Sequence, residues 1–114
     1  MIRHIVLFKF KPGVSWQRPE ALAAEDMARQ VGDRVPDLRY WYAGRNISDR
    51  PVAYDYVVVG LLADEDALRR YLDHPFHQDA IQAWREISDW VIADVVEEDA
   101  TVTSTVDDLS PAAG

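Results

Sequence analysis

Residues 3–10 read Arg-His-Ile-Val-Leu-Phe-Lys-Phe, a run that predicts a β-strand because β-branched and aromatic side chains favour extended backbone. Successive side chains of a strand point to opposite faces. The even-numbered side chains, His4 through Phe10, therefore share one face, and Ile5 and Leu7 lie on the other. Both faces carry large apolar groups, so the sheet that contains this strand needs a cover on each side.

The apolar periodicity of the remaining chain predicts three more strands and three helical segments. The strands are expected at 38–45, 53–62 and 90–96, and the helices at 16–34, from Asp64 to His74 and at 77–88. Ser15 is expected to cap the first helix and Asp64 the second, and His74-Pro75 to break the later helical region in two. The order β-α-β-β-α-β predicts an α+β, ferredoxin-like fold with its helices on one face of an antiparallel sheet. We expect a homodimer, a dimeric α/β barrel, in which two sheets cover each other's second face.

The charge of this 114-residue chain is concentrated at its C-terminal end. Residues 1–85 hold all 12 Lys and Arg and 12 of the 20 Asp and Glu, so the net charge of -8 comes from residues 86–114. We expect one domain over residues 1–99 and a disordered acidic tail over residues 100–114. A neutral body with an acidic end argues against nucleic acid and anionic membrane surfaces as partners.

Several kinds of site are excluded by composition. The chain has no Cys, which rules out disulfides, thiol nucleophiles, zinc clusters and iron–sulfur sites. It has no glycine-rich phosphate-binding motif, no apolar run near the roughly 18 residues of a membrane span, and no apolar signal segment at its N-terminus. These features predict a cytoplasmic protein with no metal and no other cofactor.

The segment from Tyr71 to His77, Tyr-Leu-Asp-His-Pro-Phe-His, is the densest group of side chains suited to proton transfer. Because Pro75 breaks the helix, Tyr71 and His77 can reach one cavity. An imidazole can take a proton near neutral pH, and a Tyr hydroxyl can stabilise a developing oxyanion, so the pair could enolise a carbonyl compound. The structural alternative is that His74 caps a helix and His77 is a half-buried imidazole without a chemical role.

Other side chains could complete such a cavity. His4 could orient a substrate or relay a proton, although a histidine on a strand is more often structural. The aromatic residues that could form an apolar wall are Tyr40, Trp41, Tyr42, Tyr54, Tyr56 and Trp84. The residues predicted to bind a substrate are His74, Phe8, Leu22, Trp84 and Tyr56.

These segments resemble the stress-responsive A/B barrel (Dabb) domain family over about residues 2–98. The matching residues are the strand from His4 to Lys11, then Gly44, Asn46, Tyr54-Asp55, the run from Ala67 to Tyr71, His74-Pro75-Phe76-His77 and Ile92-Ala93-Asp94. The resemblance implies a ferredoxin-like fold and a dimer whose two sheets close into a barrel. The fold agrees with the order of elements, and the dimer agrees with the argument that the second face of the sheet needs a cover.

The family includes a plant polyketide cyclase, which needs no cofactor and closes a poly-β-ketone chain by intramolecular aldol condensation. Its catalytic Tyr and His match Tyr71 and His77, and a further histidine of its cavity matches His4. The resemblance therefore implies a catalytic role for these three residues, with His77 as the base and Tyr71 as the oxyanion donor. Where that cyclase has bulky aromatic residues in its first helix, residues 21–24 read Ala-Leu-Ala-Ala, so we expect a cavity of different shape and a different substrate.

Three other functions are compatible with the sequence. The protein could bind a small apolar molecule, or act in a stress response, without catalysis. It could be a cofactor-free monooxygenase that consumes O₂ on an electron-rich phenolic substrate, since the same dimeric barrel serves such enzymes. It could also be a structural dimer with a filled interior, which a cavity beside His77 would argue against.

Overall fold

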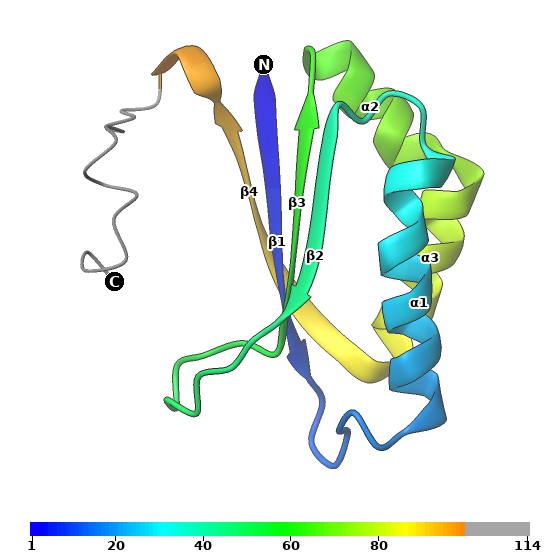
Figure 1. Ribbon diagram of the computed structural model, residues 1–114, viewed down its shortest axis with the longest axis vertical. Helices are drawn as coiled ribbons and strands as arrows, with labels where there is room; N and C mark the ends of the chain where they lie inside the picture. The colour runs from blue at the N-terminus through cyan, green and yellow to red at the C-terminus, as the bar shows by residue number, and fades with distance from the viewer. Residues whose placement is uncertain (100–114) are drawn as a thin grey trace.

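The computed structural model describes residues 1–99, and the tail predicted for residues 100–114 lies outside the described residues. Within them, a four-stranded antiparallel sheet of order β2-β3-β1-β4 is covered on one face by three helices (Figure 1). The elements are β1 (Ile2–Phe10), α1 (Pro19–Arg34), β2 (Tyr40–Arg45), β3 (Tyr56–Leu62), α2 (Glu65–Asp73), α3 (Pro75–Ile87), β4 (Ser88–Val96) and a 3-10 turn at Glu97–Asp99. The predicted ferredoxin-like α+β fold is confirmed. None of the helices in this part of the chain is long and apolar enough to cross a membrane.

Strand β1 is the centre of the sheet and pairs with β3 on one side and β4 on the other. Its even-numbered side chains face the helices, and Val6 and Phe8 are buried there in the main hydrophobic cluster. His4 lies on the same face, opposite Gly60 of β3 and Asp94 of β4. The alternation of β1 thus brings one histidine into an otherwise apolar layer.

Two helix starts were predicted from capping residues, and one prediction was wrong. Helix α1 begins at Pro19, and no side chain caps it. The Ser15 hydroxyl accepts instead from the backbone N–H of Gln17, in a turn that precedes the helix. Proline suits a first helical position because its missing N–H would have no partner there. Asp64 caps α2 as predicted, since its carboxylate accepts from the N–H of Ala67 at 2.8 Å.

The break between α2 and α3 occurs at His74-Pro75, as predicted. The backbone of His74 is extended, and its ring Nδ1 accepts from the N–H of Phe76 at 3.1 Å, so His74 is the N-cap of α3. Pro75 is the first residue of the new helix. The change in helix direction lets Tyr71, near the end of α2, face His77, near the start of α3.

The second face of the sheet is turned away from all three helices (Figure 1). Alternation along the strands puts Leu7, Tyr42 and Val91 on this outer face, and each of the three is exposed. Ile5 and Val59 lie beside them, paired across β1 and β3. The outer face is therefore an apolar surface that the described part of the chain leaves open.

Candidate functional site

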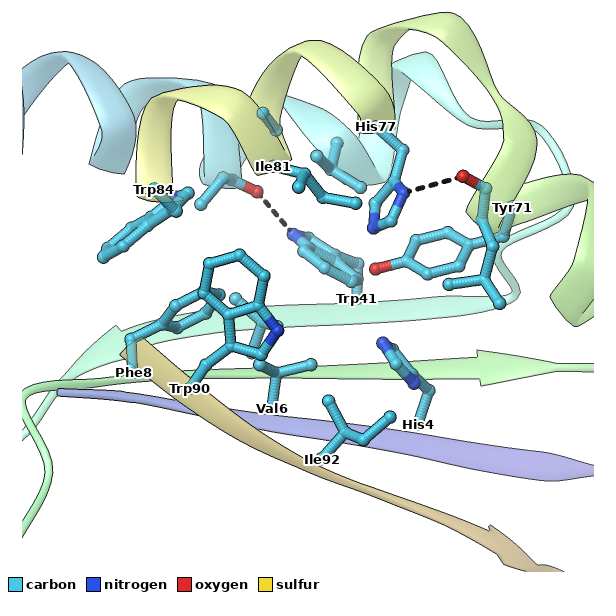
Figure 2. Close-up of a pocket in the computed structure, with 15 residues that line it drawn as sticks. His4, Val6, Phe8, Trp41, Tyr71, His77, Ile81, Trp84, Trp90 and Ile92 are labelled. Carbon is cyan, nitrogen blue, oxygen red and sulfur yellow. Dashed lines mark hydrogen bonds between the residues drawn. The ribbon is translucent and has the colours of Figure 1, made fainter. Parts of the chain in front are cut away.

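A cavity of about 150 Å³ lies between the helix-covered face of the sheet and helices α1 to α3. Residues of all four strands line one side, and residues of the helices line the other (Figure 2). Its wall is apolar apart from three ionisable side chains, His4, Tyr71 and His77. These three come from β1, α2 and α3, so the cavity joins parts of the chain that are distant in sequence.

The three ionisable side chains form one cluster at one end of the cavity. The rings of Tyr71 and His77 lie 4.2 Å apart between centroids, and those of His4 and Tyr71 lie 5.2 Å apart. In Figure 2 the hydroxyl of Tyr71 lies between the two imidazoles. The catalytic trio predicted from the sequence is therefore brought together, and its polar atoms face one space.

The orientation of His77 is set by a backbone hydrogen bond. Its ring Nδ1 lies 3.2 Å from the carbonyl oxygen of Leu72 (Figure 2). A carbonyl only accepts, so Nδ1 carries the hydrogen and Nε2 keeps the lone pair. Burial lowers the pKa of His77, and the nearby His4 and His74 lower it further, against the opposing effect of the bond to Leu72. At neutral pH the ring is therefore uncharged and able to accept a proton.

Tyr71 is a hydrogen-bond donor where His77 is a proton acceptor. Its side chain is buried, and burial raises the pKa of its hydroxyl, with a smaller contribution from the carboxylate of Asp94. The hydroxyl therefore stays protonated throughout the neutral range and can donate a hydrogen bond. A neutral base and a protonated donor in contact are the pair of groups that enolisation requires.

His4 has a carboxylate partner that the sequence reasoning did not assign. Its ring Nδ1 lies 2.5 Å from Oδ1 of Asp94, which is opposite it in the β1–β4 pairing. The carboxylate only accepts, so it holds a hydrogen on Nδ1, and Nε2 of His4 lies on the side of Tyr71 (Figure 2). Within β4 the even-numbered residues Trp90, Ile92 and Asp94 share the inner face, but only the pairing register shows that Asp94 meets His4.

The other end of the cavity is aromatic. The rings of Phe8 and Trp84 stack with centroids 4.2 Å apart, and Trp90 lies 5.7 Å from Phe8. The indole N–H of Trp41 donates to the backbone oxygen of Ala28 at 2.8 Å, which fixes this ring against α1 (Figure 2). A ligand at this end would meet flat apolar walls with almost no polar partner.

Several predicted binding residues do not line the cavity. Leu22 lies on the exposed side of α1, because this helix packs on the sheet through its small residues, including Ala21 and Ala24. Tyr56 is buried but stacks behind Trp84, with ring centroids 5.1 Å apart. The remaining cases are His74, which caps α3, Tyr40 and Tyr42, which lie on the outer face of the sheet, and Tyr54, which lies in the segment between β2 and β3.

Comparison with known proteins relates the chain to one family. The sequence model of the stress responsive A/B barrel domain matches residues 2–97. An uncharacterized protein of Streptomyces coelicolor is 50% identical over 94 residues, which cover 82% of this chain and 97% of that protein. A dimeric ferredoxin-like protein of unknown function from Thermobifida fusca has a TM-score of 0.73 at 27% identity, over 82% of this chain and 88% of that one. A Dabb family protein from Mesorhizobium loti has a TM-score of 0.69 at 25% identity, over 83% of this chain and 94% of that one.

Two enzymes share the fold at lower identity. A hydroxynitrile lyase from Passiflora edulis has a TM-score of 0.73 at 12% identity, over 89% of this chain and 96% of that one. A cofactor-independent oxygenase from Streptomyces nogalater has a TM-score of 0.64 at 19% identity, over 92% of this chain and 95% of that one. At these identities the likeness shows the fold alone, since one fold hosts many reactions.

Proposed function

The chain belongs to the stress responsive A/B barrel domain family, and we propose that its cavity binds a small β-keto compound and enolises it without a cofactor. The observation that carries the proposal is the contact between Tyr71 and His77, whose ring centroids lie 4.2 Å apart in an otherwise apolar cavity. His77 is the base, Tyr71 is the oxyanion donor, and His4 orients the substrate or relays the proton.

The proton transfer starts at Nε2 of His77. This atom takes the proton from the carbon between two carbonyl groups, and the electron pair of the broken C–H bond moves onto the nearer carbonyl oxygen. The Tyr71 hydroxyl donates a hydrogen bond to that oxygen as it becomes negative. A proton flanked by two carbonyls is acidic enough for a well-placed imidazole, so the step needs no metal.

The enolate formed in this way can react within the same molecule. Its carbon attacks a second carbonyl of the substrate, one carbon–carbon bond forms, and the proton on His77 passes to the new alkoxide oxygen. This is the addition step of an intramolecular aldol reaction of a polyketide-like chain, and loss of water from the new β-hydroxy carbonyl product completes the condensation. The aromatic end of the cavity, with Phe8, Trp84 and Trp90, would hold the folded apolar part of such a substrate.

A second candidate is binding without turnover. The cavity wall is apolar over most of its extent, which suits retention of a small apolar molecule as well as it suits catalysis. In that case Tyr71 and His77 would only anchor one polar group of the ligand. A third candidate, cofactor-free oxygenation of a phenol, uses the same base and is distinguished by the consumption of O₂.

We also propose that the protein acts as a homodimer. The outer face of the sheet exposes Leu7, Tyr42 and Val91, and apolar surfaces of this kind favour association. The similar protein from Thermobifida fusca is described as dimeric. A two-fold axis through the outer face would pack two such sheets against each other and cover both.

The enolising step can be tested by deuterium exchange. The protein is incubated in D₂O with β-keto thioesters and β-diketones, and the loss of the α-proton signal is followed by NMR. We expect the wild type to accelerate exchange at least about tenfold over buffer, and we expect His77→Ala to lose this acceleration because no other base replaces it. Tyr71→Phe should reduce it by a similar factor, since it removes only the hydroxyl.

His74→Ala is the matched control, because it removes the other imidazole of the same motif, which lies outside the cavity wall. No acceleration by folded wild-type protein for any compound would overturn the catalytic proposal. Binding of the same compounds, measured by calorimetry, would then favour the second candidate. O₂ uptake with a phenol that depends on His77 would favour the third.

A further inference from the structure

Residues 46–55 join β2 to β3, and we call them the β2–β3 arm. Two aliphatic side chains of the arm are left mostly uncovered by residues 1–99: Ile47 is 100% exposed and Val52 is 79% exposed. The arm leaves the end of the sheet and projects on the side opposite the three helices (Figure 1). It therefore extends toward the space in front of the open outer face.

The arm has a defined backbone. The N–H of Ser48 donates to the side-chain oxygen of Asn46 at 2.9 Å, and the amide nitrogen of Asn46 donates back to the carbonyl of Ser48 at 2.7 Å. The N–H of Ala53 donates to the carbonyl of Arg50 at 3.0 Å, and that of Asn46 to the carbonyl of Asp55 at 3.0 Å. These bonds form without any partner molecule, so presenting the arm to a partner costs little conformational entropy.

The base of the arm is attached to strand β1. The carboxylate of Asp55 accepts from the N–H of Phe10 at 2.8 Å, and the N–H of Asp55 donates to the carbonyl of Phe8 at 2.8 Å. The ammonium of Lys9 donates to the carbonyl of Ala53 at 3.1 Å. The base of the arm is thus fixed to the central strand of the sheet by hydrogen bonds, so its orientation relative to the sheet is fixed.

We infer that the arm is a dimerisation element: in a homodimer, Ile47 and Val52 of each protomer pack against the sheet of its partner. The inference rests on the homodimer of the proposed function and names a second contact in it. The arm projects on the side of the sheet away from the helices (Figure 1), and the paired, exposed residues Leu7 and Val91 lie on the sheet face away from the helices, so one partner can cover both.

A second copy of this chain fits the arm because a two-fold interface must be compatible with itself. The tip of the arm carries one acid and one base, Asp49 and Arg50, so two copies meet without net repulsion between their arms. In a two-fold dimer each contact occurs twice, so the dimer would bury two copies of Ile47 and two of Val52. Removing them should therefore have a large effect for a small change in sequence.

The test compares dimer dissociation constants by sedimentation velocity over a dilution series. The arm variant is Ile47→Ser with Val52→Ser, and its matched control in the same loop is Asp49→Ser with Arg50→Ser. Leu7→Glu serves as the variant of the sheet face. We expect the dissociation constant to rise at least about tenfold for the arm variant, to stay within about threefold for the control, and to rise beyond measurement for Leu7→Glu.

The possible results separate the arm from the dimer as a whole. An unchanged constant for the arm variant, with dissociation by Leu7→Glu, overturns the arm and leaves the dimer. Equal weakening by the arm variant and its control also overturns it, because the loop conformation would then matter rather than the two aliphatic side chains. A wild type that is monomeric at every concentration overturns both proposals.

A second measurement does not depend on dissociation. Ile47 is replaced by the photoreactive residue p-benzoylphenylalanine, and the product of irradiation is mapped by mass spectrometry. We expect a cross-link to a second chain, at a residue of its outer sheet face. A product confined to one chain would overturn the inference.

Discussion

The Nδ1 atom of His4 lies 2.5 Å from Oδ1 of Asp94, directly across the pairing of β1 with β4. A carboxylate in this position only accepts, so Nδ1 of His4 carries a hydrogen, and Nε2 lies on the side of Tyr71 (Figure 2). Four side chains of the site therefore contact one another in a row. Asp94 on the edge strand β4 contacts His4, His4 contacts Tyr71, and Tyr71 contacts His77.

Asp94→Asn tests this relationship. The amide can present an N–H to His4 where the carboxylate only accepts, so the hydrogen of the ring is expected to shift to Nε2. We expect exchange activity to fall at least about tenfold, because the wrong tautomer faces Tyr71. ¹⁵N NMR of the histidine rings reports the tautomer directly. Lost activity with an unchanged His4 tautomer would contradict the assigned role.

The pH dependence of exchange follows from two pKa shifts. His77 acts as a neutral base, and its pKa is lowered from 6.5 by burial, so activity should fall only when the pH drops below about 6.5. Tyr71 acts as a protonated donor, and its pKa is raised from 10.0 by burial, so the alkaline loss should come only above about pH 10. After subtraction of the buffer rate, kcat/KM should be flat between these limits. An acidic loss centred above pH 7 would contradict the assignment of His77 as the base.

His74→Ala should affect stability and leave the chemistry intact. The ring Nδ1 of His74 caps α3 by accepting from the N–H of Phe76. Loss of an N-cap costs about 0.5–2 kcal/mol, which urea unfolding measures. The exchange rate of the folded variant should stay within about twofold of the wild type. Complete loss of exchange at unchanged stability would mean that His74 acts in the reaction.

Gly32→Ala should destabilise the protein, although alanine normally favours a helix over glycine by about 1 kcal/mol. A Cβ at position 32 would lie 2.8 Å from Cδ1 of Trp41, and the ring cannot retreat because its N–H is bonded to Ala28. We expect a loss of about 1–3 kcal/mol in urea unfolding. Asp33→Ala, at an exposed neighbouring position, should change stability by less than about 0.5 kcal/mol. Greater stability of Gly32→Ala would show that Trp41 can move.

The positions of the elements were predictable because their signals are local. The alternation along residues 3–10 predicted β1, and His74-Pro75 predicted the helix break that lets Tyr71 face His77. The exception was Ser15, which resembles a helix cap in sequence but closes a turn before Pro19. When a proline follows a capping-type residue, the sequence alone does not show whether the helix begins at that residue or at the proline.

The composition of the cavity wall was less predictable. Trp41 and its neighbours Tyr40 and Tyr42 look equivalent in sequence, yet only Trp41 faces the helices, because side chains alternate along β2. Leu22 is the larger side chain on α1, but Ala21 and Ala24 face the sheet. The rotation of a helix and the phase of a strand depend on what each packs against, and that information lies elsewhere in the chain.

The sequence by itself determined the order of elements, the two-sided apolar character of β1 and the helix break that brings Tyr71 and His77 together. These follow from periodicity and turn chemistry within a few residues. Only the tertiary structure decided that Asp94 meets His4 and that Trp90 and Ile92 close the cavity. The physical reason is that the register of two paired strands depends on contacts between residues about 90 positions apart. The local sequence around either strand carries no information about its partner.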